Sequence, residues 1–311
     1  MQTQSMPGSL PDPIKRLAAA GYYRYKSWEG DYSHEQPSIS FNRRADATDH
    51  IVIIVIDALR PDFEPELQIP FGRAITPGTW TFPAVTSIHT GTYPHKHEAV
   101  AHTHPDDDSY IIPEQATPDI TLPEAFESAG YDTYAGLAFM TPFLAIKGWY
   151  ESHRVYRDTT AEQVIQGYRK WRSGREPTFS YLHLGDLHAP IEPPSNYVEQ
   201  YNIDTSLQDL PQLTRYTDDY DDSNSCRRFR EERLKLYQAA LDYVEDILKK
   251  FVDRYSNNTT ILISGDHGEA HWEHYKRDHQ FTDSRPNYGV GHGGTPFDMV
   301  ARVPATLHTP S

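Results

Sequence analysis

The chain has 311 residues, of which 37% are hydrophobic, so it can bury a sizeable core as one large domain or two modest ones. Its 44 acidic and 29 basic residues give a formal net charge of −15 at pH 7, which argues against a nucleic-acid polymer or an anionic membrane as partner. The single cysteine, Cys226, excludes an internal disulfide framework and any multi-cysteine metal site, so a metal would need Asp, Glu and His ligands.

Residues 1–49 are polar and contain one short helical candidate, Ile14–Ala20. We interpret them as an N-terminal extension packed on the outside of a catalytic domain that spans residues 50–311. No basic-then-apolar leader opens the chain, and no apolar run reaches the length of a membrane helix. These features predict a cytoplasmic protein without a transmembrane segment, and they leave a homo-oligomer open.

The first strong element is His50–Asp57, an unbroken run of apolar, β-branched residues that ends in a carboxylate. Such a run is typical of a central parallel strand covered on both faces. A carboxylate at the carboxyl end of a buried strand lies on the edge where open α/β sheets bind their ligands. Asp57 could instead cap the following helix.

Thr81 directly precedes a Phe-Pro pair within the segment Gly78–His97. Pro83 suits the first turn of a helix, which Gly91 then ends. The free N–H groups of that turn can bind an anionic oxygen beside Thr81, which suggests phosphate or sulfate chemistry. An ordinary helix cap is the alternative role of this threonine.

The rest of the chain alternates helices with strands, which predicts an α/β fold: a three-layer α/β/α sandwich with a mostly parallel central sheet. Residues 191–226 are rich in Pro, Asp, Asn and Ser and predict a lid or surface loop. The expected elements are helices at Ala84–Thr90, Thr121–Ala129, Thr160–Arg172 and Leu234–Tyr255, and strands at Tyr131–Leu137, Thr178–Leu184, Thr259–Ser264 and near Val303.

Three carboxylates, those of Asp57, Asp186 and Asp266, each follow an apolar strand, so we expect them at one edge of the sheet. Carboxylates gathered there repel one another unless a divalent cation lies between them. A metal would also lower the pKa of the Thr81 hydroxyl and so activate it as a nucleophile.

Histidines near these strand ends indicate which metal would bind. His267 directly follows Asp266, and His188 and His292 lie in loops. Mixed oxygen and nitrogen ligation favours zinc, manganese or iron over calcium. Taken singly, each histidine is more often a surface or hydrogen-bonded residue than a ligand.

Five sequence pieces together resemble the alkaline phosphatase and sulfatase superfamily, over most of the chain from about Ile51 to Val303. Their order and approximate spacing match as well. The pieces are Val55-Ile-Asp-Ala-Leu-Arg-Pro-Asp62, Thr81-Phe-Pro with Thr90-Gly-Thr-Tyr-Pro-His-Lys-His97, His183-Leu-Gly-Asp-Leu-His-Ala-Pro190, Ser264-Gly-Asp-His-Gly-Glu269, and Gly291-His-Gly-Gly294 with Arg302-Val-Pro304.

The resemblance implies a role for each matching residue. It makes Thr81 the catalytic nucleophile and a metal ligand, together with Asp57, Asp266 and His267. It implies that the remaining candidates bind a second metal or the substrate; these are Asp186, His188 and His292. It implies one or two divalent ions, zinc or manganese first, with magnesium or calcium as alternatives.

Two departures separate the chain from type I sulfatases, which carry Cys or Ser in Cys/Ser-x-Pro-x-Arg. Here Thr81 replaces the convertible residue and Val85 replaces the arginine. The threonine motif is similar to that of nucleotide pyrophosphatase/phosphodiesterases. Many relatives also continue into a small C-terminal subdomain after the position of Arg302, and we expect that subdomain to be lacking.

From this resemblance we predict an ester hydrolase that acts on phosphate esters, with phosphodiesters favoured, through a covalent intermediate on Thr81. The expected substrate is a small-molecule or a glycan- or lipid-linked phosphate or sulfate ester. Three alternatives stay open: a sulfuric ester hydrolase, a phospho- or phosphoglycerol transferase, and a non-catalytic metal-binding protein of the same fold.

Overall fold

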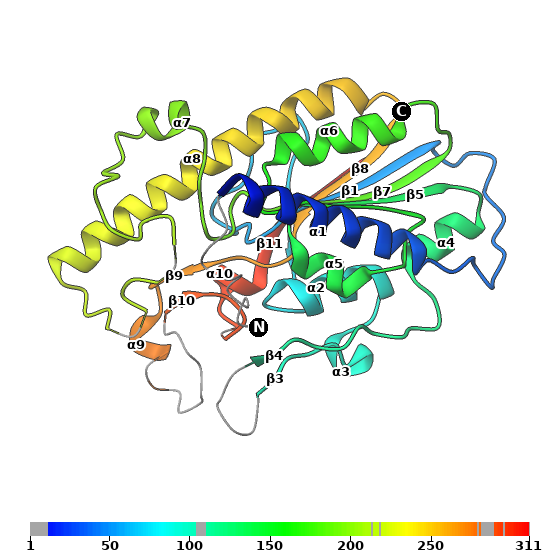
Figure 1. Cartoon of the computed structure of the whole chain (residues 1–311). Coiled ribbons are helices and arrows are strands. Elements are labelled where there is room, and N and C mark those ends of the chain that lie inside the picture. Colours follow the sequence, from blue (N-terminus) through cyan, green and yellow to red (C-terminus); the bar gives the residue numbers. More distant parts are fainter. Residues whose placement is uncertain are drawn as a thin grey trace.

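A computed structural model describes residues 12–103, 110–212, 214–217, 219–278, 280, 289–294 and 296–310. Among these residues, a seven-stranded sheet with the order β2-β11-β8-β1-β7-β5-β6 forms the centre of the fold (Figure 1). Of these seven strands only β11 runs in the opposite direction to the others, so the predicted mostly parallel sheet is confirmed. Its strands are β1 (His50–Ile56), β2 (Gly72–Ile75), β5 (Asp132–Leu137), β6 (Ser152–Val155), β7 (Thr178–Leu184), β8 (Thr259–Gly265) and β11 (Arg302–His308).

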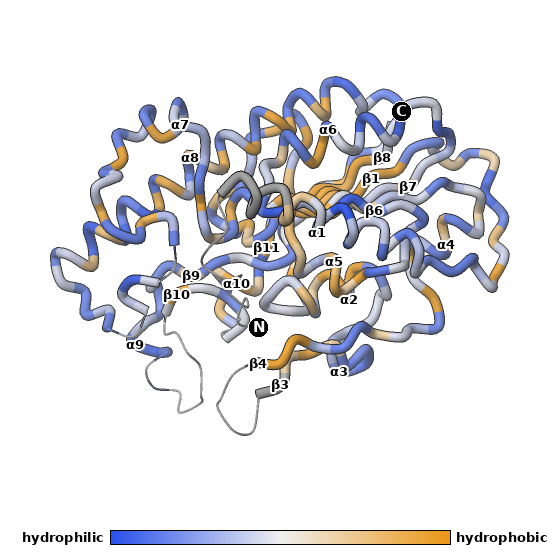
Figure 2. Tube along the Cα trace, viewed as in Figure 1, coloured by the Kyte–Doolittle hydropathy of each residue, from blue (hydrophilic) through white to orange (hydrophobic). Residues whose placement is uncertain are grey.

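Helices cover both faces of the sheet, which confirms the predicted three-layer sandwich (Figure 1). Side chains of β1 alternate between two cores: Ile54 packs with α6 (Ala161–Arg172) and α8 (Asn224–Tyr255), whereas Val55 packs with α2 (Thr81–Thr90) and α5 (Met140–Ile146). Figure 2 shows these central strands as an apolar band between more polar helices. The unbroken apolar run of β1 therefore reflects burial on both faces.

Shorter elements complete the described part of the chain. Two small antiparallel ribbons lie outside the main sheet, one formed by β3 and β4 and the other by β9 and β10. These elements are α3 (Pro94–His97), β3 (His102–Thr103), β4 (Tyr110–Ile111), α4 (Leu122–Ser128), α7 (Ser195–Gln200), β9 (Ala270–His271), α9 (Tyr275–Asp278), β10 (Val290–Gly291) and α10 (Asp298–Ala301).

The helix α8 begins earlier than the sequence pattern predicts, at Asn224 instead of Leu234. Ser223 caps it, because its side chain accepts a hydrogen bond from the backbone N–H of Cys226. Buried Cys226 and Phe229 extend the apolar stripe towards the cap, although charged residues between them make this stretch resemble a loop in the sequence.

The N-terminal helix α1 (Asp12–Tyr32) is also longer than the predicted Ile14–Ala20, and it lies beside the edge strand β6. Two of its side chains accept hydrogen bonds from backbone N–H groups of that strand. Ser27 accepts from Val155 at 2.9 Å, and Asp31 accepts from His153 at 2.5 Å. The helix thus satisfies donors that no neighbouring strand reaches.

We expect the stability of the fold to fall in mild acid, in part because of His89 in α2. This histidine is 1% exposed, and burial lowers its pKa to about 4 from the ordinary 6.5. The folded state therefore disfavours the charged ring, so stability is full above pH 6.5 and is lost as the pH falls towards 4. A shift of this size corresponds to about 3 kcal/mol.

Urea unfolding at pH 7 and pH 4.5 tests this expectation, with His89→Gln as the comparison. Glutamine cannot titrate but can still hydrogen-bond near Val85 and Tyr150, the present partners of the imidazole. The variant should lose less stability than the wild type on acidification. An equal loss in both proteins would contradict a contribution from His89.

Candidate active site

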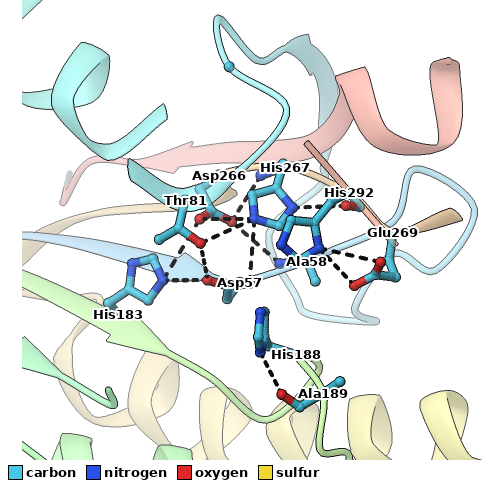
Figure 3. Close-up of polar contacts among 12 residues, drawn as sticks. Asp57, Ala58, Thr81, His183, His188, Ala189, Asp266, His267, Glu269 and His292 are labelled. Carbon is cyan, nitrogen blue, oxygen red and sulfur yellow. Dashed lines mark hydrogen bonds and ion pairs between the residues drawn. The ribbon is translucent and has the colours of Figure 1, made fainter. Parts of the chain in front are cut away.

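Two neighbouring strands bring the predicted carboxylates together. Strands β1 and β8 pair in parallel with Ile56 opposite Gly265, so Asp57 and Asp266 leave the sheet side by side. Both side chains are buried, at 0% and 1% exposed. Figure 3 shows them facing Thr81. The expected convergence of these residues at one sheet edge follows from this register.

Thr81 is the first residue of α2, but its hydroxyl does not cap the helix. The N-cap is Trp80, which makes no side-chain capping bond. Thr81 Oγ1 instead donates a hydrogen bond to Asp57 Oδ2 at 3.0 Å and lies 3.3 Å from His267 Nε2 (Figure 3). The helix start therefore presents this hydroxyl to the carboxylates.

The carboxylates each keep one buried oxygen that has no hydrogen-bond partner among the described residues, Asp57 Oδ1 and Asp266 Oδ2. The other oxygen of Asp266 accepts from the backbone N–H of His267 at 2.9 Å. Buried anionic oxygens without donors are unfavourable, so these two atoms indicate a missing cationic partner.

The proton affinities of the carboxylates diverge. Burial and then the charge of Asp57 raise the pKa of Asp266 to about 8. Burial also opposes ionisation of Asp57, but His188 and His267 outweigh it and hold its pKa below the ordinary range. Because both groups cannot ionise readily side by side, a divalent cation between them would remove the conflict.

His267 presents a nitrogen lone pair to the same point. Its Nδ1 lies 2.8 Å from the carbonyl oxygen of Gly268, which leaves Nε2 to accept, 3.6 Å from both Asp57 Oδ1 and Asp266 Oδ2. Burial lowers its pKa to about 4, so the ring is neutral at pH 7. A Cβ on Gly268 would lie 2.0 Å from the carbonyl oxygen of Met299, which explains the glycine here.

His183 joins this group although the sequence prediction did not include it. Its Nε2 lies 2.9 Å from Asp57 Oδ2 and 3.8 Å from Asp266 Oδ2, and its Nδ1 lies 2.7 Å from Tyr181 Oη. Among the described residues, ligand atoms of Asp57, His183 and Asp266 all lie within 4.8 Å of one another. The sequence did contain one sign of this role: His183 is the only histidine in the strand Thr178–Leu184. It lies two residues after Tyr181 and so on the same face of that strand.

This set of donors fits a divalent metal ion. It combines two carboxylates, two imidazoles and a hydroxyl, and it includes the two unpartnered carboxylate oxygens. Mixed oxygen and nitrogen donors of this kind suit zinc or manganese. The residues that would bind the ion are Asp57, Thr81, Asp266 and His267, with His183 in reach.

A second pair of histidines borders this group. His292 Nδ1 lies 3.1 Å from Glu269 Oε2, and its ring centroid is 4.2 Å from that of His267. Burial would lower the pKa of His292, but the carboxylate of Glu269 raises it to about 9. The ring is therefore a cation at neutral pH. His188, whose ring lies 5.3 Å from that of His292, completes the pair.

A cavity of about 410 Å³ adjoins His188 and provides room for part of a substrate. Phe139 lines it, with its ring 5.4 Å from the rings of both His183 and His188. Thr141 and Thr160 add hydroxyl groups to the wall. The cavity therefore adjoins the site at His188 and has a partly aromatic wall.

The carboxylate of Asp186 makes its hydrogen bond elsewhere, at the start of α6. Its two carboxylate oxygens are 2.9 Å and 3.2 Å from the backbone N–H of Ala161, the first residue of α6, and accept its hydrogen bond. Burial raises the pKa of Asp186 to about 7, although that N–H group partly offsets the effect. The carboxylate thus bonds the start of a helix, outside the ligand group described above, and Asp186 also lines the cavity beside His188.

We expect Asp186→Ala to lower the free energy of unfolding by about 1 to 2 kcal/mol, because it removes this cap. Asp186→Asn should cost little, since asparagine caps helices nearly as well. Urea unfolding gives the stabilities, and metal titration of both variants tests whether Asp186 also binds a metal ion. A loss of bound metal in Asp186→Asn would show that the carboxylate is a ligand.

The fold is shared with solved structures of the alkaline phosphatase and sulfatase superfamily, a class of α/β proteins. Within that class the chain belongs to the sulfatase family, whose sequence profile matches residues 66–292. No curated protein sequence matches the chain.

Solved structures with the same fold include enzymes of several activities, all at low sequence identity. The C-terminal periplasmic domain of EptC from Escherichia coli is 12% identical, with a TM-score of 0.57 over 89% of this chain and 77% of that one. The phosphonate monoester hydrolase of Agrobacterium radiobacter is 13% identical, with a TM-score of 0.58 over 84% and 68%. A protein in complex with its substrate D-glucosamine-2-N,6-O-disulfate is 12% identical, with a TM-score of 0.63 over 85% and 72%.

Among the described residues, every helix is too short or too polar to cross a membrane.

Proposed function

We propose that this protein is a metal-dependent hydrolase of phosphate esters, with phosphodiesters favoured, and that Thr81 is its nucleophile. One observation supports this most directly: at the start of α2, Thr81 Oγ1 is buried and donates a hydrogen bond to Asp57 Oδ2 at 3.0 Å. A buried hydroxyl directed into a set of metal-type donors suits nucleophilic chemistry.

The side chains have distinct tasks in this proposal. Thr81 Oγ1, oriented by its hydrogen bond to Asp57, loses its proton to solvent and attacks phosphorus in line with the leaving alkoxide. A divalent ion, zinc or manganese, would supply Lewis acidity that favours the threonine alkoxide and the charge on the phosphoryl oxygens. Water then hydrolyses the phosphothreonine.

His292 and His188 border the place where the phosphoryl group would lie. The cationic ring of His292, held by Glu269, stabilises negative charge on phosphoryl oxygens. His188 lines the adjoining cavity and would contact the leaving alcohol, but burial lowers its pKa, so the protonated ring of His292 is the better proton donor to that alcohol.

Phosphorus is favoured over sulfur because Thr81 and Val85 replace the residues that type I sulfatases use. Structural relatives also support phosphorus chemistry and a metal. These relatives include a phosphonate monoester hydrolase and an EptC domain in complex with zinc, the latter 13% identical with a TM-score of 0.57 over 89% of this chain and 77% of that one.

We expect purified protein with added zinc or manganese to cleave an aryl phosphodiester faster than the matching aryl sulfate, by about tenfold or more in kcat/KM. Release of the aryl alcohol measures both reactions under the same conditions. The protein treated with a chelator serves as the control and should cleave neither ester. Faster cleavage of the sulfate would assign the chain to sulfuric ester hydrolysis.

Phosphoryl transfer is a second candidate, because the structural relatives include phosphoethanolamine transferases such as EptC. The same phosphothreonine would then pass its group to an alcohol in place of water. Product analysis with an added alcohol acceptor distinguishes the two outcomes, since transfer produces a new ester at the expense of the free acid.

A further inference from the structure

A cationic groove lies between the edge strand β6 and the helix α6, and none of its lining residues belongs to the candidate active site. Its volume is about 870 Å³. Three cationic side chains line it, Arg154, Lys170 and Arg175, and its lining contains no carboxylate. The chain as a whole has a net charge of −15, so a cluster of three positive charges without a carboxylate stands out from the rest of its surface.

Two of these cations have no acidic partner among the described residues. Arg154 and Lys170 are exposed and make no ion pair there, whereas Arg175 lies 3.8 Å from Asp132. The guanidinium of Arg154 lies 5.3 Å from the ring centre of Tyr156, which positions it at the groove. The charge of Arg154 and Lys170 is therefore available to a ligand.

Buried hydrogen-bond donors also line the groove. Tyr134 lines the groove and is 3% exposed, and its hydroxyl has no partner among the described residues. The indole N–H of Trp171, whose ring stacks on Tyr134 at 4.8 Å, is also buried without a partner. A buried polar group without a partner is unfavourable, so these donors indicate a ligand that accepts hydrogen bonds.

A glycine in the middle of α6 creates the floor of the groove. A Cβ on Gly167 would lie 2.1 Å from Tyr156 Oη and 3.2 Å from Tyr134 Oη. Any larger residue would displace the Tyr156 hydroxyl. Glycine is unfavourable inside a helix, and here it leaves space at the floor of the groove.

We propose that this groove is a second binding site, one that takes a tetrahedral oxyanion, the phosphate or sulfate group. Its lining offers cations and donors, and an oxyanion has several acceptor oxygens and a negative charge to match both. The oxyanion would come either from a free inorganic anion or from an ester group on a larger molecule.

Isothermal titration with inorganic sulfate and inorganic phosphate tests the site in the metal-loaded protein. The wild type should bind at the groove in addition to the active site. Lys170→Gln combined with Arg154→Gln should weaken the groove component by at least about tenfold and leave turnover of the aryl phosphodiester unchanged. Lys250→Gln, an exposed cation on α8 outside the groove, should change neither.

Tyr134→Phe and Tyr168→Phe form a matched pair, because both tyrosines are buried with unpartnered hydroxyls but only Tyr134 lines the groove. Of these two variants, only Tyr134→Phe should weaken binding, by about fivefold.

A sulfated monosaccharide and a phosphorylated one replace the inorganic ions in a second series of titrations. Tighter binding of either sugar than of the inorganic ion would identify an ester group as the ligand. Identical isotherms for the wild type and the Lys170/Arg154 variant would overturn the proposal.

Discussion

We expect Thr81→Ala to reduce turnover of an aryl phosphodiester by about 10⁴-fold or more while the protein keeps its metal. The substitution removes the attacking oxygen, and no other hydroxyl is bonded to Asp57 among the described residues. The remaining donors, Asp57, Asp266 and His267, still suffice for a metal ion. Steady-state kinetics gives the loss of turnover, and elemental analysis gives the metal content.

Thr81→Ser is the matched control for this prediction. Serine keeps the hydroxyl and removes only a methyl group, so it should retain a substantial part of the activity. If Thr81→Ala keeps activity within about tenfold of the wild type, the nucleophile lies elsewhere. If it loses both activity and metal, the hydroxyl acts mainly as a ligand.

Asp266→Asn has the second large expected effect, a loss of metal affinity of at least about 10²-fold. Changes to residues that merely orient ligands cost 10- to 100-fold, and Asp266 is expected to be a direct ligand. The metal-free variant should be more stable than the metal-free wild type, because asparagine removes a carboxyl whose pKa is raised to about 8 by burial and then by the charge of Asp57.

Thermal unfolding with and without zinc or manganese measures both consequences. Saturating metal at 100 times the dissociation constant should stabilise the wild type by about 2.7 kcal/mol and Asp266→Asn far less. Asp253→Asn, an exposed site on α8, should behave as the wild type. Equal stabilisation of the wild type and Asp266→Asn by metal would remove Asp266 from the proposed ligands.

Much of the sheet was predictable because its strands have strong local signals. The apolar run of β1 and the bounds of β7 match the prediction. Parallel pairing then fixes where Asp57 and Asp266 emerge, so their proximity follows from topology alone. The location of Thr81 at a helix start was also readable, from the proline that follows it.

Other features depend on contacts that a local pattern does not contain. His183 lies inside a strand, so a search of residues that follow strands missed it. The carboxylate of Asp186 does follow a strand, but it meets the start of α6, which only the three-dimensional arrangement reveals. Helix α1 is stabilised by its contact with β6, and its own sequence suggests only a short helical stretch.

The contact between α1 and β6 has a consequence for self-association. An edge strand with open N–H groups can recruit a strand from another molecule, and such recruitment leads to aggregation. Ser27 and Asp31 occupy the two open donors of β6 with side-chain oxygens, which leaves no backbone pattern for another strand to extend. The N-terminal helix therefore closes this side of the sheet against further growth by hydrogen bonding.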